Sequence, residues 1–314
     1  MKAVNVLKVF AWCFALITVN PSFAQGLITF SNGEIADADE INSNFSALDS
    51  RLNEVEDMNF GFVGNNIQAY KLVQVDCAAD AAALTKAWEA NYATNQIKFL
   101  INGRCDFPYP NVGFSGKSVI IEGQPEGTLE CPDVLPSIVS PSGLDIAYGA
   151  LWLNCVKLDG DTFIAAYANG YIRLGNISTA ASDQTITVWL RNNSTLRVFG
   201  PVQLDNVRAW GGSQVTLEPV QASASAPVTV APPIESLQLY ASSTLWCNGC
   251  SGNVTTLTMR GGSDASFVPR SPGLNVTTLD AAQGARISVN AVNGDVVIEN
   301  EILAENATVY RRSE

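Results

Sequence analysis

Residues 253–268 and 275–290 carry the same pattern of apolar residues, although nearly every polar residue differs between them. The first segment reads NVTTLTMRGGSDASFV and the second reads NVTTLDAAQGARISVN. Apolar and polar residues alternate on both sides of a short turn, which a small residue closes. This alternation indicates strands that bury one face, and a repeat of about 20 residues is typical of units that stack on their neighbours. The chain is therefore constrained to fold as a stack of similar coils.

The same pattern extends over the second half of the chain when the small residue closing each turn is taken as position zero. Positions −9, −6, −4, +2 and +4 are apolar in nearly every coil, which predicts that they face the core. The exceptions are Asp161 and Thr185 at −9, Glu301 at −6 and Arg311 at +4. The zero positions are Gly170, Ser194, Ser213, Ser243, Ser263, Ala285 and Ala307, at intervals of 24, 19, 30, 20, 22 and 22 residues.

These features predict an all-β fold, a β-solenoid domain over residues 67–314. Its three apolar clusters per turn resemble the right-handed parallel β-helix of the pectate-lyase-like superfamily, and this resemblance covers roughly residues 70–314. The 30-residue interval is assigned to a loop at 219–233, because its Pro, Ala and Ser residues do not continue a central strand.

A solenoid must cover its first edge, since open strands pair with other chains. The segment DAAALTKAWEANYA places Leu84, Trp88 and Tyr92 at helical spacing. We therefore expect a helix over residues 80–93 that caps the solenoid with these three side chains. The alternative is a helix that binds a partner.

Residues 1–24 have the pattern of a signal peptide, with lysines, a short apolar run and small residues at the expected cleavage site. No other segment reaches the roughly 18 apolar residues that a membrane-spanning helix needs. The sequence therefore predicts export without a membrane span, to the periplasm, the cell surface or the medium.

Residues 25–66 form a separate N-terminal segment in this interpretation. Its apolar residues follow a heptad pattern, which predicts a helix over about 36–58. Two interpretations remain open: an amphipathic helix that lies on the domain, or the short stalk of a homo-oligomer, for which a trimer is favoured. The seam consists of Ile41, Phe45, Leu48, Leu52 and Val55. Residues 27–55 also resemble the N-terminal segment shared by many exported proteins of Gram-negative bacteria, which implies a presentation or assembly element.

The composition excludes several classes of function. The chain has 18 Lys and Arg against 30 Asp and Glu, a formal net charge of −12, and no histidine. An acidic surface repels nucleic acid and anionic membranes, so neither is expected as a partner. The lack of histidine excludes Ser-His-Asp and Cys-His nucleophiles and imidazole-ligated metals. We expect no cofactor, with Ca²⁺ considered only for a lyase.

Six cysteines follow the signal peptide, and an even number in an exported chain indicates disulfides. The sequence alone allows 15 pairings, and we predict that neighbours pair: Cys77 with Cys105, Cys131 with Cys155, and Cys247 with Cys250. The CNGC segment at 247–250 also fits a redox pair, but no thioredoxin-like alternation of strands and helices surrounds it.

Outward positions stack into columns along a solenoid, so we expect a binding site to appear as a column of related side chains. Rings that alternate with arginines suit stacking on sugars and pairing with carboxylates. The other interpretation is an ordinary surface, because exposed strand positions favour aromatic residues. The candidate glycan-contact residues are Arg191, Trp210, Tyr240 and Arg260 at position −3, with Trp189 and Arg208 at position −5.

The resemblance to pectate-lyase-like proteins implies two enzymatic routes. Hydrolases of this architecture use clustered carboxylates and a GHG-type segment, whereas here the nearest acidic cluster is DGD at 159–161, which fits a turn equally well. Lyases abstract a proton with Arg or Lys, helped by Ca²⁺ on acidic residues. Arg208 or Arg260 would take that role, but the nearby acids are scattered at Asp205, Asp264 and Asp280.

No residue is therefore assigned a catalytic role. The leading hypothesis is a non-catalytic exported β-helix that acts in surface structure, adhesion or glycan contact, with a polysaccharide as the expected ligand. The alternative is a polysaccharide lyase of unknown specificity.

Overall fold

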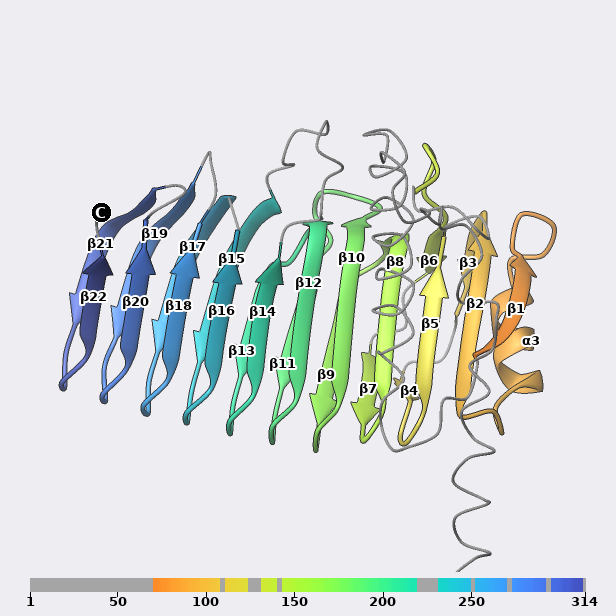
Figure 1. Cartoon of the computed structure of the whole chain (residues 1–314). Helices are drawn as coiled ribbons and strands as arrows, with labels where there is room; N and C mark the ends of the chain where they lie inside the picture. Colours follow the sequence, from red (N-terminus) through yellow and green to blue (C-terminus); the bar gives the residue numbers. More distant parts are fainter. Residues whose placement is uncertain are drawn as a thin grey trace, which may run out of the picture. The chain divides into compact units, whose positions relative to one another are not determined.

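The β-rich part of the chain winds into stacked coils. The computed structural model describes residues 70–107, 111–123, 131–139, 143–218, 231–249, 252–269, 273–291 and 295–312. They lie in the compact unit Gln68–Glu314 and form a β-solenoid of about nine turns, whose neighbouring strands lie side by side in Figure 1. The predicted parallel β-helix is confirmed.

The described strands form a 13-stranded sheet and a 9-stranded sheet. The chain alternates between the sheets, so strands next to one another in a sheet come from successive coils and pair in parallel, as β10 does with β8 and β12. The larger sheet runs β1 (Lys71–Asp76), β2 (Gln96–Asn102), β5 (Ser118–Glu122), β8 (Ala150–Asp159), β10 (Tyr171–Thr179), β12 (Thr195–Val202), β14 (Gln214–Glu218), β16 (Thr244–Asn248), β18 (Asp264–Val268), β20 (Arg286–Asn290) and β22 (Thr308–Arg312), with β3 (Arg104–Asp106) and β6 (Ser137–Val139) pairing off this path. The smaller sheet runs β4 (Asn111–Gly113), β7 (Gly143–Ala147), β9 (Thr162–Tyr167), β11 (Ile186–Leu190), β13 (Asn206–Ala209), β15 (Ala231–Leu239), β17 (Gly252–Met259), β19 (Leu274–Ala281) and β21 (Val296–Leu303).

A two-residue turn leads from the smaller sheet to the larger one in each coil from β9 onward. Both central residues have positive φ, as in the type I′ turns that join strands tightly. In one coil these are Asn192 and Asn193, with φ of 55° and 61°. The residue at position zero follows them. The buried hydroxyl of Ser194 donates to the carbonyl oxygen of Arg191 at 2.7 Å. Position zero is thus the buried end of the turn, which explains its small side chains.

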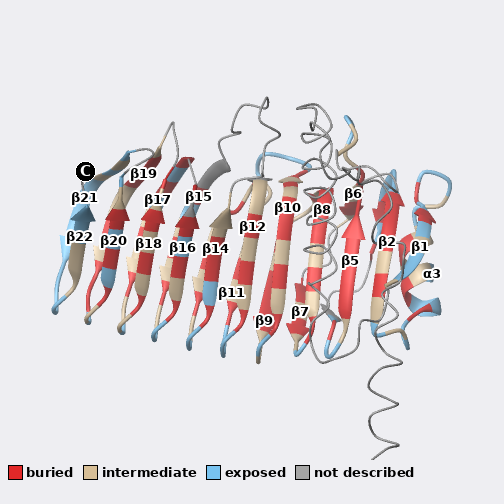
Figure 2. Cartoon of the chain, in the orientation of Figure 1, coloured by how far each residue is buried: buried red, intermediate tan, exposed pale blue. Residues whose placement is uncertain are grey.

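The apolar positions form one continuous core. The side chains at −6, −4 and +2 are almost fully buried in the coils before the last one, and those at +4 are buried except for the partly buried Leu217. The two exceptions at −9 reflect a shift by one residue, because Thr162 and Ile186 are the buried and paired residues in those coils. The alternation predicted from the sequence is therefore confirmed (Figure 2).

The larger sheet bends in the middle of three of its long strands, where residues of positive φ turn the chain: Cys155, Asn176 and Gly200. A polar ladder lies close to this bend. The side-chain amide of Asn176 donates to Asn154 at 3.2 Å, and that of Asn154 donates to Glu122 at 3.0 Å. Glu122 is buried, and Lys98 pairs with it at 2.6 Å. The ion pair and the amide compensate for burial of this carboxylate.

The helix α3 (Ala83–Ala90) lies at the first end of the solenoid, next to β1 (Figure 1). Its Leu84 and Trp88 are buried in the core, and the Trp88 ring meets Phe99, Phe107 and Phe114. The predicted cap is thus confirmed, although the helix is shorter than residues 80–93. Tyr92 follows the helix and is 59% exposed, but its ring meets Trp88 edge to face at 5.8 Å, so it lies at the exposed margin of the cap.

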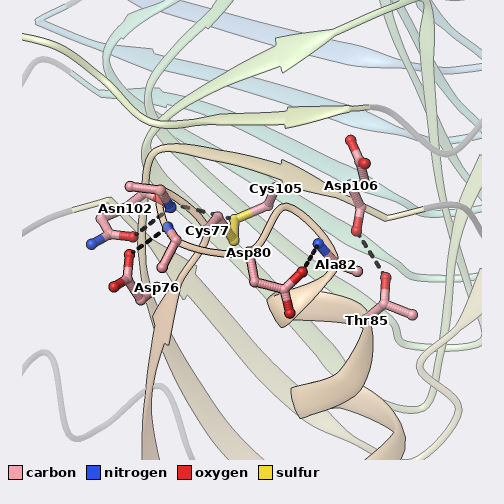
Figure 3. Close-up of a disulfide and its surroundings, with 10 residues drawn as sticks. Asp76, Cys77, Asp80, Ala82, Thr85, Asn102, Cys105 and Asp106 are labelled. Carbon is pink, nitrogen blue, oxygen red and sulfur yellow. Dashed lines mark hydrogen bonds between the residues drawn. A yellow bond between two sulfur atoms is a disulfide. The ribbon is translucent and has the colours of Figure 1, made fainter.

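Two disulfides anchor this end of the solenoid. Cys77 bonds Cys105, and Cys131 bonds Cys155, as predicted. Figure 3 shows the first of these beside the start of α3, where Asp80 accepts from the Ala82 amide and the Thr85 hydroxyl donates to the Asp106 carbonyl oxygen. Cys247 is also disulfide-bonded. Its predicted partner, Cys250, lies outside the described residues.

The predicted loop at 219–233 is too long at its C-terminal end, because β15 begins at Ala231. The pairing of β15 with β17 is irregular between Ala231 and Ile234, so the two prolines sit at a bulge, where a missing amide hydrogen is tolerated. The signal peptide, the segment 25–66 and its heptad helix all lie outside the described residues. None of the helices within the described ranges is long and apolar enough to cross a membrane.

The last described coil departs from the pattern. Leu303 is 41% exposed and Val309 is only partly buried, and Figure 2 shows β21 and β22 largely in the colour of exposed residues. At two inward positions this coil carries charges, Glu301 above Leu279 and Arg311 above Val289. These two side chains form an ion pair.

Candidate functional site

The residues of the predicted glycan column lie on the smaller sheet and on the turns that leave it. Trp189 in β11 and Arg208 in β13 are directly paired neighbours on the outer face. The −3 residues follow the ends of these strands, and each begins a turn. Trp210 donates its amide to Leu190 of the preceding coil, and Tyr240 donates to Ala209. The stacking of coils therefore sets the column in register.

The aromatic rings of the column touch one another. Trp210 and Tyr240 are stacked, with centroids 5.0 Å apart and an interplanar angle of 28°. Trp189 meets Trp210 edge to face at 6.4 Å, and Phe163 meets Trp189 in the same way at 5.0 Å. Four rings thus form one continuous ridge, held by aromatic pairing of about 0.5–1.5 kcal/mol per contact.

Two arginines lie against this ridge. The Arg191 guanidinium is 5.4 Å from the Trp189 centroid and 5.5 Å from that of Trp210, and Arg208 is 5.3 Å from Trp189. These are cation–π distances. None of the described carboxylates forms an ion pair with Arg191 or Arg208. The two cations therefore retain donors for an anionic ligand. We call Phe163, Trp189, Arg191, Arg208, Trp210 and Tyr240 the aromatic column.

Arg260 does not join the aromatic column in the way that its position suggests. Its guanidinium pairs with the Asp280 carboxylate at 2.6 Å and donates to the backbone oxygens of Met259 and Asp280. Three hydrogen bonds of this guanidinium are thus made within the protein. The neighbouring coil supplies an acid at position −5, and a charged hydrogen bond outweighs extension of the ridge.

Two residues near the column were not predicted from the sequence. Tyr167 occupies position −3 in the coil before Arg191; burial and the nearby Asp145 raise the pKa of its phenol, and Arg191 lowers it. Phe163 lies at −7, outside both columns considered, and reaches Trp189 diagonally. Extending the −3 column by one coil would have found Tyr167, whereas no repeat position indicates Phe163.

A second group of rings and arginines covers the larger sheet between β8 and β14. The Arg173 guanidinium lies between the rings of Trp152 and Phe199, 4.1 Å and 4.3 Å from their centroids. Arg197 pairs with Glu218. Burial raises the pKa of the neighbouring Tyr171 to about 12. The residues of this group are partly buried, and their rings and guanidinium groups pack on one another, so the group acts mainly as packing.

The acidic residues weighed for catalysis serve local structure. Asp159 pairs with Arg104 at 3.0 Å. Asp161 accepts from the amide and the hydroxyl of Thr185, and Asp205 accepts from the Ile186 amide. The DGD segment is the turn between β8 and β9, with Gly160 at φ 125°. The described residues contain no group of three or more acidic or cysteine side chains arranged to hold a metal ion.

The aromatic column is therefore the part of the predicted site that the fold assembles. It spans successive coils, combines ring surface with unpaired guanidinium groups, and lies on rigid strands and tight turns. No protein family, curated protein or solved structure matches the chain.

Proposed function

We propose that the protein is a non-catalytic exported β-helix that contacts carboxylate-bearing glycans through the aromatic column, in surface structure or adhesion. The observation that carries this proposal is the contact of Arg191 with both Trp189 and Trp210. It places a cation with spare donors on a ridge of rings.

Uronate-containing glycans match both features of the column. A sugar ring presents C–H groups that pack on an aromatic edge or face, and a carboxylate accepts charge-assisted hydrogen bonds from guanidinium groups. Successive coils are about 4.8 Å apart, so the column offers repeated contacts to an extended polymer. Several weak contacts of this kind add through effective concentration.

Export is part of the proposal. Two described disulfides and a third bonded cysteine fit an oxidising compartment, where such bonds persist. The N-terminal signal pattern and the resemblance of residues 27–55 to exported Gram-negative proteins point the same way. Membership of the pectate-lyase-like superfamily belongs to the proposal too, on the likeness of architecture alone.

Assembly into a homo-oligomer, with a trimer favoured, completes the proposal. Multiple copies would multiply weak glycan contacts. Light scattering of the mature protein beside a version lacking residues 25–60 tests this part. Equal monomeric masses across the micromolar range would rule out the stalk and leave a surface helix.

The binding proposal is tested on a printed array of uronate-containing and neutral glycans, followed by titration with the best uronate oligosaccharide. We expect Arg191→Gln/Arg208→Gln to weaken binding about tenfold, because charge-assisted bonds contribute about 1.5–3 kcal/mol each and exposed sites recover part of this in water. Binding should also weaken with added salt. Arg312→Gln removes an exposed charge elsewhere and should leave the affinity unchanged.

Three results would overturn the proposal. Wild-type affinity in the Arg191/Arg208 variant would remove the column from the site, and an array without bound uronate glycans would exclude the ligand class. Release of unsaturated uronate products from a bound polymer would show a lyase instead of a non-catalytic protein.

A further inference from the structure

The outer face of the larger sheet carries a second pair of aromatic rings, far along the solenoid from α3. Trp246, Ser266, Ser288 and Tyr310 lie at position +3 of successive coils and are directly paired across β16, β18, β20 and β22. Adjacent strands are about 4.8 Å apart, so the two ring-bearing positions are separated by about 14 Å. Two small hydroxyl side chains lie between two large rings.

This arrangement forms an open trough of about 540 Å³, walled by Trp246 and Tyr310. The two residues are 47% and 62% exposed. Within the described part of the chain neither ring packs on another ring or on a cation, in contrast to the aromatic column, where the rings cover one another. Their faces are available to a ligand. Exposed apolar surface bordered by polar residues is a feature of ligand-binding grooves.

One side of the trough is an ion pair. The Nε and Nη2 atoms of Arg286 donate to the two carboxylate oxygens of Asp264, at 2.7 Å and 3.0 Å. Together the two groups are neutral. Among the described residues that line the trough, Arg286 is the one that carries a positive charge. Because Asp264 already balances the charge of Arg286, the trough offers no net attraction to an anionic ligand. Sugar hydroxyl groups both donate and accept, so they can join the pair without breaking it.

We propose that the trough binds a neutral, linear oligosaccharide that runs along the solenoid from Trp246 to Tyr310. Its end sugars stack on the two rings, while the middle of the chain lies over the hydroxyl groups of Ser266 and Ser288 and beside the Asp264–Arg286 pair. Rings about 14 Å apart cannot both stack on one sugar, so the ligand is an oligosaccharide and not a monosaccharide. This site is separate from the aromatic column in position, in charge and in ligand class.

The test begins with the same printed array, which carries neutral glucans, xylans, mannans and galactans beside uronate-containing glycans. The best neutral oligosaccharide is then titrated by tryptophan fluorescence and by calorimetry. We expect Trp246→Ala/Tyr310→Ala to weaken binding of the neutral oligosaccharide about tenfold or more, as truncation of stacking residues does in other interfaces. Trp246→Tyr/Tyr310→Phe keeps both rings and should retain most of the affinity.

Two control variants separate the trough from the rest of the protein surface. Tyr148 is 64% exposed, nearly the same as Tyr310, so Tyr148→Ala measures the effect of removing an exposed ring elsewhere and should change nothing. Arg191→Gln/Arg208→Gln disables the aromatic column and should leave neutral binding intact. The proposal is overturned if no neutral glycan binds, or if the Trp246/Tyr310 alanine variant binds as tightly as the wild type.

Discussion

Glu301 and Arg311 form an ion pair across the last described coil, although each occupies a position that is apolar in the coil below. Both residues are exposed, so this end of the described core carries a compensated pair of charges where the coil below carries buried apolar side chains. No described strand pairs with the outer edges of β21 and β22. Inward-pointing charges are one way in which sheet proteins prevent unwanted pairing at such edges.

This relationship predicts that Glu301→Leu/Arg311→Leu makes the protein self-associate. The double variant extends the apolar surface of Leu303 and Val309 at an edge with which no described strand pairs, so its apparent mass should rise with concentration in light scattering. Glu299→Leu/Arg312→Leu adds the same two side chains at exposed positions of the same coil and should stay closer to the wild-type mass. A concentration-independent mass for the first variant would contradict the role of the pair.

The continuity of the core predicts a large effect of a buried charge. Leu257 is 1% exposed, so Leu257→Asp should lower the free energy of unfolding by several kcal/mol, about the cost of burying an unpaired polar or charged group. Denaturant unfolding measures the change. Thr255 lies on the outer face two residues away and is exposed, and Thr255→Asp is the matched control. Equal stabilities of the two variants would mean that the inward face is wrongly assigned.

The buried phenol of Tyr171 predicts a pH dependence in the alkaline range. Its folded pKa is about 12, above the ordinary value of about 10. A raised pKa means that the folded state favours the neutral phenol. The contribution of Tyr171 to the free energy of unfolding is therefore fully present below about pH 10 and is lost as the pH rises towards 12.

The loss should amount to about 2–3 kcal/mol of unfolding free energy. Tyr171→Phe should lose less stability than the wild type across the same pH window, in denaturant titrations at fixed ionic strength. Tyr148→Phe changes an exposed tyrosine and should follow the wild type. Parallel curves for the wild type and Tyr171→Phe would show that the phenol is not responsible.

The cysteines predict a chain without reactive thiols. Maleimide labelling of the mature protein, denatured but not reduced, should modify none of the six cysteines that follow the signal peptide, because Cys77, Cys105, Cys131, Cys155 and Cys247 are all disulfide-bonded. Labelling after reduction provides the positive control. Two or more modified cysteines before reduction would contradict the pairing and reopen a redox role for Cys247 and Cys250.

The inward-facing residues could be predicted from the sequence because the same repeat positions are buried in successive coils. Ile164, Val188 and Val207 occupy the same position in successive coils, and a period of two is visible without knowledge of the partner strands. The turns were harder to recognise. Ala168 with Asn169 and Glu305 with Asn306 adopt positive φ without the glycines that usually indicate such turns.

The arrangement of the outward-facing side chains depends on contacts between coils, and the spacing of residues in the sequence does not determine these contacts. Arg260 matches Arg191 in position but finds Asp280, whereas Arg191 finds tryptophans. Trp246 and Tyr310 share position +3, and two intervening serines make the trough. Reading that column would have identified the residues, but only the stacked strands show that the two rings stay exposed.

The two rims of the solenoid differ in how they respond to a change of chain length. On one rim, a two-residue turn precedes Ser213 and another precedes Ser243. The buried hydroxyl of each serine donates to the carbonyl oxygen at the start of its turn, which fixes the length of the turn and so the alignment of each coil with the next. On the opposite rim, β14 ends at Glu218 and β15 begins at Ala231, and the sequence has 12 residues between them. A peptide added there would leave the rows of side chains in both sheets aligned, whereas one residue added to a tight turn would shift every later row. The solenoid is thus a scaffold that should accept inserted peptides on one rim, whereas the fixed turn length on the other rim keeps its coils aligned.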